Sequence, residues 1–185
     1  MEDNVLIEQF LSGDEQGFTM LVKKYQDQVA NIVHSLTQPA RNVDDIVQEV
    51  FIKVYNGLRA FRKEAEFSTW LYRITLNTTY NYIKKEERYV PVDAVEETVA
   101  SSKHTWGDLE SREKQKLVSQ ALKSLPFQFR SAIVLKEIEG LTYKEIAKAL
   151  NCRIGTVESR LFRARQMLKE ILTPIINQEA TNAVS

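Results

Sequence analysis

The chain has 185 residues, of which 43% are hydrophobic and 27% charged, so its composition predicts one globular domain or two small ones and excludes wholesale disorder. No apolar run reaches about 18 residues and the acidic first residues are no secretory signal, so we expect a cytoplasmic protein without a membrane span. One cysteine and two histidines exclude an internal disulfide framework and predict neither a metal site nor a cofactor. The net charge is zero, yet it is −6 over residues 1–49, +4 over 50–90, −1 over 91–125 and +3 over 126–185, which indicates separate surfaces for separate partners.

Helical periodicity dominates the first half of the chain. With 6 Gly and 4 Pro, and with apolar residues recurring at spacings of three and four, the sequence predicts an almost all-helical protein. The spacing predicts helices over 5–11, 14–36, 43–58 and 69–88. We expect the inward stripe of the helix over 69–88 to contain Phe67, Leu71, Ile74, Thr78 and Tyr82.

The second half of the chain begins with a polar segment, 91–108, whose lack of apolar periodicity predicts a flexible linker. After it the spacing predicts helices over 109–125, 127–139, 142–151 and 155–172, with Pro174 ending the last one. We therefore expect an all-α protein with two small helical domains joined by a flexible linker. The expected boundaries are 1–90 for the first domain, 91–108 for the linker, 109–176 for the second domain and 177–185 for a polar tail.

The third and fourth predicted helices of the second domain have the spacing of a helix-turn-helix. Thr142 and Glu145 form a capping-box pattern, and Asn151 suits the left-handed conformation that a sharp turn needs. Basic residues outnumber acidic ones five to one over 153–169, as expected of a helix that enters a major groove. The predicted outward face contains Thr156, Ser159, Arg160, Phe162 and Arg163. A helical protein-binding domain would show the same spacing, and this alternative stays open.

One face of the predicted helix over 69–88 has the chemistry of a nucleic-acid surface. Arg73, Asn77 and Asn81 recur every four residues, and amides can read base edges while Arg holds phosphates. Aromatic residues suited to stacking on unpaired bases flank this face: Phe61, Trp70 and Tyr72. A solvated polar face beside a core tryptophan is the alternative.

The predicted helix over 43–58 has a second polar face. Its members lie off the apolar stripe: Asp45, Gln48, Glu49 and Ile52. Carboxylates around an exposed isoleucine predict a protein-docking surface, and a solvated acidic surface is the alternative.

These motifs in combination resemble the bacterial sigma-70 family, and within it the small extracytoplasmic-function (group IV) sigma factors of the sigma-E type. Five segments spread over nearly the whole chain carry the resemblance: 13–18 (GDEQGF), 44–55 (DDIVQEVFIKVY), 67–77 (FSTWLYRITLN), 141–147 (LTYKEIA) and 155–165 (GTVESRLFRAR). Family members commonly carry Lys or Arg where this chain has Glu158, a side chain that would accept from cytosine N4 or repel phosphate.

The resemblance implies an alternative sigma factor, not an enzyme, that binds the β′ clamp helices and β flap of core RNA polymerase and directs initiation at promoters. The implied polymerase-binding residues are Asp44, Asp45, Gln48, Glu49 and Ile52. The implied −10 DNA-binding residues are Phe61, Arg62, Lys63, Trp70, Arg73, Asn77 and Asn81. The implied −35 DNA-binding residues are Thr156, Glu158, Ser159, Arg160, Phe162 and Arg163. The resemblance also implies an anti-sigma factor, often membrane-anchored, that holds the protein inactive.

A stand-alone helix-turn-helix regulator is the alternative of a different class. Such a regulator would bind a symmetric DNA site, usually as a dimer. The sequence shows no dimerisation helix beyond its two domains, so we expect a free monomer. An enzyme is the third class, and the sequence contains no nucleophile–base pair, metal-ligand spacing or Gly-rich phosphate loop that would favour it.

Overall fold

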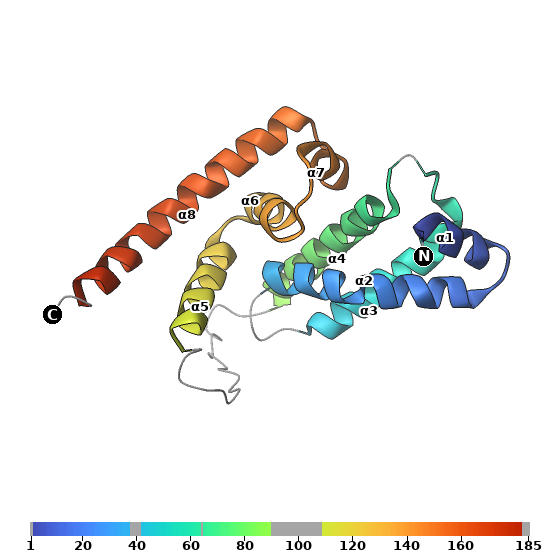
Figure 1. Cartoon of the computed structure of the whole chain (residues 1–185), viewed down its shortest axis with the longest axis horizontal. Helices are drawn as coiled ribbons and strands as arrows, with labels where there is room; N and C mark the ends of the chain where they lie inside the picture. Colours follow the sequence, from blue (N-terminus) through green and yellow to red (C-terminus); the bar gives the residue numbers. More distant parts are fainter. Residues whose placement is uncertain (1, 38–41, 64, 90–108, 183–185) are drawn as a thin grey trace.

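The computed structural model describes residues 2–37, 42–63, 65–89 and 109–182, and this part of the chain consists of helices and loops (Figure 1). The first domain contains α1 (Asp3–Leu11), α2 (Glu15–Leu36), α3 (Val43–Gly57), the short 3-10 helix η1 (Leu58–Ala60) and α4 (Phe67–Tyr89). The second domain contains α5 (Leu109–Ser124), α6 (Phe127–Ile133), the π-helical segment η3 (Val134–Ile138), α7 (Tyr143–Ala149) and α8 (Ile154–Asn182). The predicted all-α class with two helical domains is confirmed. None of the described helices is long and apolar enough to span a bilayer.

A close crossing of α1 and α2 opens the first domain. A Cβ atom at Gly17 would collide with the backbone of Leu6 and Phe10, so glycine is what permits this approach. The apolar stripes of α1 to α4 then meet in what we call the first-domain core. This core includes Leu21, Val29, Val33, Ile46, Val50, Val54 and Leu71. Because it holds one side of α3 and of α4, it fixes the direction of their polar faces.

The helix-turn-helix of α7 and α8 forms as the sequence predicts. The Glu145 backbone N–H donates to Thr142 Oγ1 at 3.3 Å and the Thr142 N–H donates to Glu145 Oε2 at 2.7 Å, which completes the capping box. Asn151 has φ +49°, the left-handed conformation expected for the turn. Val157 and Leu161 of α8 are buried, so the opposite face of that helix points out of the domain.

The last helix is longer than the sequence predicts. α8 continues through Pro174 to Asn182, so the expected helix end at Pro174 is wrong, and residues 177–182 of the expected polar tail are helical. A proline removes one backbone donor but has a helical φ, so a helix can pass through it at a local cost. The predicted linker over 91–108 lies outside the described residues.

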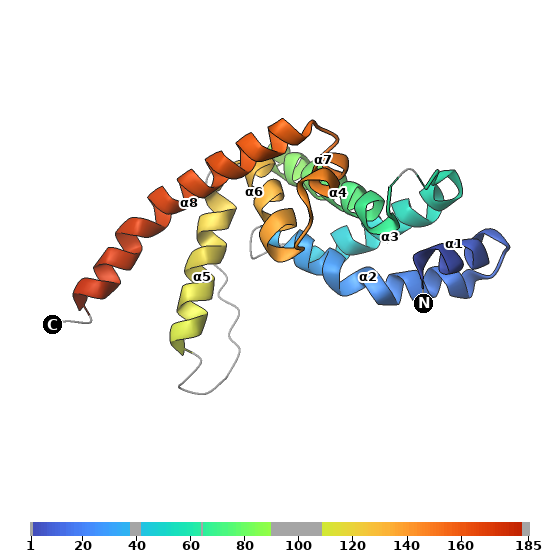
Figure 2. The same ribbon diagram turned by 45° about the horizontal axis from the view of Figure 1, so that its top comes forward.

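The second apolar core joins the two domains, and we call it the shared core. It contains Leu125, Ile133, Leu135, Ile146, Val157 and Leu161 of the second domain together with Ile32, Leu36, Tyr72 and Leu76 of α2 and α4. Both views show α7 beside α4 (Figures 1 and 2). The second domain thus covers a side of α4 for which the sequence predicted no packing partner. The expected inward stripe of this helix is therefore incomplete. Ile74 and Tyr82 are half-buried, whereas Leu76 is 3% and Tyr72 5% exposed.

Candidate docking and nucleic-acid surfaces

The outer face of α3 is an exposed acidic surface around one isoleucine. Ile46, Val50 and Val54 lie in the first-domain core, which turns the positions between them outward. Ile52 is 54% exposed, a large value for an apolar side chain. The five residues predicted to bind a protein are all exposed on this helix: Asp44, Asp45, Gln48, Glu49 and Ile52. The arrangement suits docking through an apolar centre with an acidic rim.

The polar face of α4 also forms as predicted. Arg73, Asn77 and Asn81 are exposed and lie about one helical turn apart. Leu71 in the first-domain core and Leu76 in the shared core hold α4 on two sides and fix this orientation. Arg73 forms no ion pair or side-chain hydrogen bond with another described residue, so its guanidinium is available to an anion.

An aromatic cluster holds the loop between η1 and α4. The Phe61 ring centroid lies 5.0 Å from that of Trp70, and the Phe67 centroid lies 5.8 Å from it. Gly57 makes room for Trp70, since a Cβ atom there would lie 3.2 Å from the indole ring. Trp70 packs against the first-domain core and is half-buried, so part of its ring surface stays exposed, and its role in binding nucleic acid stays a prediction.

The same loop borders a cavity of about 400 Å³. Its lining includes Phe61, Arg62, Trp70 and Arg73 of the first domain and Lys148 and Asn151 of the second. Cationic and aromatic side chains on one wall suit an unpaired base and its phosphate. Beside the cavity, Lys63 has φ +55° and donates from Nζ to Glu8 Oε1 at 3.0 Å, which ties the loop to α1.

The outward face of α8 carries the residues predicted to read a major groove. Phe162 is 63% exposed, and Glu158, Ser159 and Arg163 are exposed, whereas Thr156 and Arg160 are half-buried. Sequence reasoning did not single out Arg165, which donates to Glu137 Oε1 at 2.8 Å. This hydrogen bond raises the pKa of Arg165 and links α8 to η3.

The two candidate nucleic-acid faces meet across a second cavity, of about 590 Å³. Arg73 and Asn77 line it from α4, and Asn151 and Arg160 line it from the helix-turn-helix. On another side of this cavity the rings of Tyr80 and Phe127 lie 5.0 Å apart between centroids. Sequence reasoning predicted each face but missed that they face one another. The sequence contained one signal of this packing: Leu76 is apolar although it lies off the expected inward stripe of α4.

Tyr72 lies at the boundary between the domains, not at the nucleic-acid face where the sequence placed it. Its hydroxyl oxygen is 3.4 Å from Gln28 Oε1 and 3.4 Å from Glu139 Oε2. Burial raises the pKa of Tyr72. Burial also raises the pKa of the Glu139 carboxyl, although the hydrogen bond from Tyr72 opposes this effect. The contact places a partly buried acid on the second domain against a buried phenol on the first.

The described side chains form no cluster of three or more His, Cys, Asp or Glu that could hold a metal ion. The described side chains form one acidic face on α3 and two faces with basic residues, on α4 and α8, that also carry amide or aromatic groups. These are means of recognising a protein and a nucleic acid.

Comparison with known proteins decides the family. Residues 21–89 match the family model described as Sigma-70 region 2, and residues 115–168 match the model described as Sigma-70, region 4. The chain is 39% identical to the ECF RNA polymerase sigma-E factor of Escherichia coli K12, over 96% of this chain and 98% of that protein. The chain belongs to the extracytoplasmic-function (ECF) sigma factors of the sigma-70 family.

Solved structures of sigma factors resemble this ECF sigma factor over both domains. CnrH, solved in complex with the cytosolic domain of CnrY, matches with a TM-score of 0.71 and 28% identity over 93% of this chain and 97% of its own. The sigma factor RpoE of Bartonella quintana, solved with the anti-sigma factor NepR, matches with a TM-score of 0.70 and 27% identity over 84% of this chain and 96% of its own. The first domain is thus the region 2 domain and the second is the region 4 domain.

Proposed function

We propose that this ECF sigma factor binds core RNA polymerase in the cytoplasm and directs it to promoters that carry −10 and −35 elements. One observation carries the proposal: a single chain of sigma type presents an exposed docking face on α3 and separate nucleic-acid faces on α4 and α8. In this proposal residues 1–90 form the region 2 unit, 91–108 the linker and 109–176 the region 4 unit.

The face of α3 is the proposed polymerase contact. Ile52 supplies an apolar anchor, and the surrounding rim of Asp44, Asp45, Gln48 and Glu49 supplies complementary charge to a basic partner. We assign this face to the β′ clamp helices, and we assign a second polymerase contact, with the β flap, to region 4.

The loop after η1 and the polar face of α4 are the proposed −10 contact. Phe61 and Trp70 offer stacking surfaces for an unpaired base, and such stacking is worth about 1–3 kcal/mol per base. The proposed phosphate and base-edge contacts come from Arg62, Lys63, Arg73, Asn77 and Asn81. These contacts would repay the cost of unpairing the duplex.

The N-terminal half of α8 is the proposed −35 contact in the major groove. Arg160 and Arg163 are suited to guanine or phosphate, and Phe162 to a thymine methyl group. Thr156 and Ser159 lie on the same face, and Glu158 would accept a hydrogen bond from cytosine N4. Glu158 therefore gives this protein a −35 preference that a basic residue would not give.

An anti-sigma factor is the proposed regulator. NepR is the anti-sigma factor in the solved complex of a relative whose fold matches this chain over both domains. We propose that a protein of this kind holds the present sigma factor inactive by covering its polymerase or DNA contacts.

Two variants test the division of roles. Ile52→Asp removes the apolar anchor of α3, so we expect loss of co-elution with core polymerase in gel filtration and loss of transcripts. Arg160→Ala leaves α3 intact, so we expect normal co-elution but a fall in transcription of about 5- to 150-fold, which corresponds to the loss of about 1–3 kcal/mol of base discrimination. Transcription is measured by run-off synthesis on templates that the wild-type protein uses.

Met20→Asp and Lys169→Ala are the matched controls, since both residues are exposed and lie outside the proposed contacts. Both controls should behave as wild type. Co-elution of Ile52→Asp with core polymerase at wild-type strength, or loss of co-elution in Arg160→Ala, would contradict the assigned roles.

A further inference from the structure

The loop between η1 and α4, which we call the −10 loop, lies beside α1, a helix outside the proposed DNA and polymerase contacts. A cavity of about 250 Å³ is lined by Asp3 and Asn4 of α1 and by Lys63 and Ala65 of this loop. Ala65 also lines the 400 Å³ cavity on the side of the proposed base. The −10 loop is thus a wall between two cavities. Because a cavity provides no packing, the position of this wall depends on a small set of specific contacts.

The first of these contacts begins at a carboxylate of α1. Asp3 Oδ2 accepts a hydrogen bond from the Tyr25 hydroxyl at 2.5 Å, and Lys24 Nζ donates to Asp3 Oδ1 at 2.5 Å. The ring centroid of Tyr25 lies 5.4 Å from that of Phe67, and the Phe67 centroid lies 6.0 Å from that of Phe61. Phe61 lines the 400 Å³ cavity. A chain of contacts therefore leads from α1 to the surface offered to an unpaired base.

The middle of this chain is buried. Tyr25 is 6% exposed and Phe67 is 3% exposed. Burial raises the pKa of Tyr25 and the hydrogen bond to Asp3 raises it further, so the hydroxyl stays a donor at neutral pH. A buried phenol without an acceptor leaves a donor unpaired, which favours movement of its ring toward another acceptor. Asp3 therefore fixes the Tyr25 ring, and this ring supports Phe67.

The second contact lies further along the −10 loop, at Lys63. This residue has φ +55°, a left-handed conformation that costs free energy for any side chain with a Cβ atom. Such a residue keeps its conformation only where its surroundings hold it. Lys63 Nζ donates to Glu8 Oε1 at 3.0 Å, and both side chains are exposed. An exposed ion pair is weak, so we expect Glu8 to contribute less than Asp3, and the ammonium keeps donors for a phosphate.

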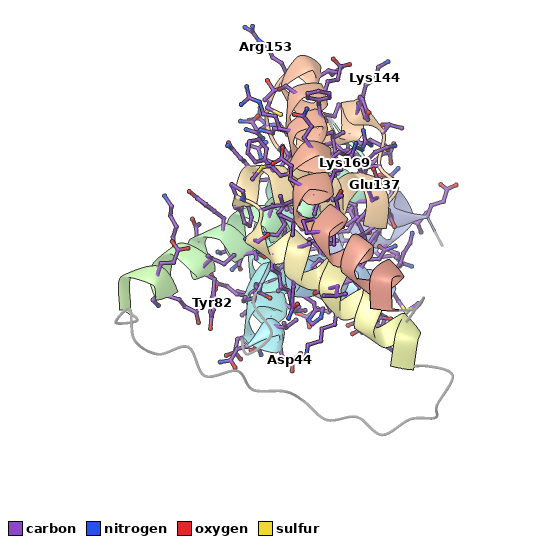
Figure 3. The ribbon with its side chains drawn as sticks, turned by 90° about the vertical axis from the view of Figure 1, so that its left-hand side faces the viewer. Asp44, Tyr82, Glu137, Lys144, Arg153 and Lys169 are labelled. Carbon is purple, nitrogen blue, oxygen red and sulfur yellow. The ribbon has the colours of Figure 1, made fainter. Side chains whose placement is uncertain are left out.

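The −10 loop and the start of the polymerase face lie in different parts of the molecule. The 400 Å³ cavity beside this loop is also lined by Lys148 and Asn151 of the helix-turn-helix. Figure 3 shows Asp44, at the start of α3, at the end of the molecule opposite Arg153 of the helix-turn-helix. A shift of the −10 loop therefore leaves this part of the polymerase face in place, so base capture and polymerase binding can be altered separately.

We propose that α1 positions the −10 loop and that its carboxylates, Asp3 and Glu8, determine how strictly the loop selects an unpaired base. Asp3 acts through the buried aromatic contacts and Glu8 acts through Lys63, so both are positioning residues without a DNA contact of their own. Contact between a base and an aromatic ring weakens steeply when the ring moves by a fraction of an ångström, so selection depends on where the loop is held. The inference rests on the proposed function, because it takes the −10 loop to receive an unpaired base.

Base preference in run-off transcription tests this proposal. The full chain is assayed with core RNA polymerase on a promoter that the wild-type protein uses, with each of the four bases placed in turn at every −10 position. The readout is the ratio of transcription between the best and the worst base. Glu8→Lys replaces the ion pair by repulsion and should narrow the largest ratio by about two- to fivefold.

Asp3 variants test the buried contacts in the same assay. Asp3→Ala removes a charged acceptor and should narrow the ratio by about tenfold. Asp3→Asn keeps an oxygen that can accept from Tyr25, so its ratio should lie between those of Asp3→Ala and the wild type.

Glu2→Lys is the matched control. It makes the same charge change directly before α1, at an exposed residue that caps no helix with its side chain and lines neither cavity. The control should keep the wild-type ratio, and all variants should co-elute with core polymerase. A loss of stability alone lowers transcription from every template alike and leaves the ratio unchanged, so the ratio separates positioning from a merely structural role.

Acrylamide quenching of Trp70 in the free chain is a second measurement, made in a Trp106→Phe background that leaves one tryptophan. The Phe61 ring covers Trp70 at 5.0 Å between centroids, so displacement of the −10 loop in Asp3→Ala should increase quenching more than Asp3→Asn does. Wild-type base ratios in both Asp3→Ala and Glu8→Lys, or wild-type quenching in Asp3→Ala, would overturn the positioning role. Failure of the wild-type protein to direct any transcript would refute the proposed function, whereas quenching would still decide whether α1 holds the loop.

Discussion

The first-domain core and the shared core use the same kinds of side chain but differ in which elements close them. The first-domain core is closed by α1 to α4, η1 and the loop after it, all within the first domain. The shared core takes Leu36 and Leu76 from region 2 and packs them among side chains of region 4. The difference teaches that most of the apolar burial of region 2 is completed within that domain, whereas Leu36 and Leu76 are buried only because region 4 packs against them.

The largest effect should follow from a cavity inside region 4. Leu161 is fully buried, so Leu161→Ala should lower the free energy of unfolding by about 2–5 kcal/mol. Hydrogen exchange should show lower protection of α6 to α8 and unchanged protection of α1 and α3. Equal loss of protection in α1 would show that the two cores are not separate.

A smaller, more diagnostic difference should separate two neighbours on α2. Val33 lies in the first-domain core and Leu36 in the shared core, and both are fully buried. Val33→Ala should cost about 1–3 kcal/mol and lower protection in region 2 alone. Leu36→Ala should cost about 2 kcal/mol or more and lower protection in both domains. Identical exchange patterns would remove the distinction between the cores.

Thr142→Ala, which removes the N-cap side chain of the capping box, should cost about 1 kcal/mol, confined to the helix-turn-helix. Hydrogen bonds from the Thr142 hydroxyl and backbone lower the pKa of Glu145 below its usual value of 4.5. Its contribution to stability is thus complete above pH 4.5 and is lost as the pH falls through the lower pKa of the folded state. The melting temperature of Glu145→Gln should depend less on pH below this value than that of the wild type. Parallel curves for the two proteins would contradict the assignment.

The smallest expected effect concerns the charge at the domain boundary. Burial raises the pKa of Glu139, so the folded state disfavours its carboxylate, and stability falls as the pH rises from the unfolded to the folded pKa. Glu139→Gln removes this penalty and keeps an acceptor for Tyr72, so it should raise stability at pH 7 by up to about 0.5 kcal/mol. Glu137→Gln, which removes the exposed ion pair with Arg165, serves as the control and should give no gain.

Local features of the fold could be predicted from the sequence because their causes are local. The capping box of Thr142 and the left-handed Asn151 each depend on residues within one turn, and both are present. The exposed faces of α3 and α4 follow from helical spacing alone. The end of α8 could not be predicted in this way, because a proline favours a helix end locally but its φ is compatible with a helix, and α8 continues through Pro174.

The arrangement of the candidate site could not be predicted, because it depends on contacts between residues far apart in the sequence. Tyr72 lies two residues after Trp70 and directly precedes Arg73, so local chemistry placed it at the nucleic-acid face. Its burial against Glu139 exists because region 4 packs there, and no periodicity within α4 encodes that contact. The roles of the predicted DNA-binding residues stay predictions until they are tested.

The measurement that tests the central claim most directly is run-off transcription by bacterial core RNA polymerase on a library of genomic fragments, with and without this protein. We predict discrete new transcripts whose start sites share two upstream elements at a constant separation. The absence of such transcripts, together with no association with core polymerase in gel filtration, would contradict the assignment of this chain as a promoter-specificity subunit.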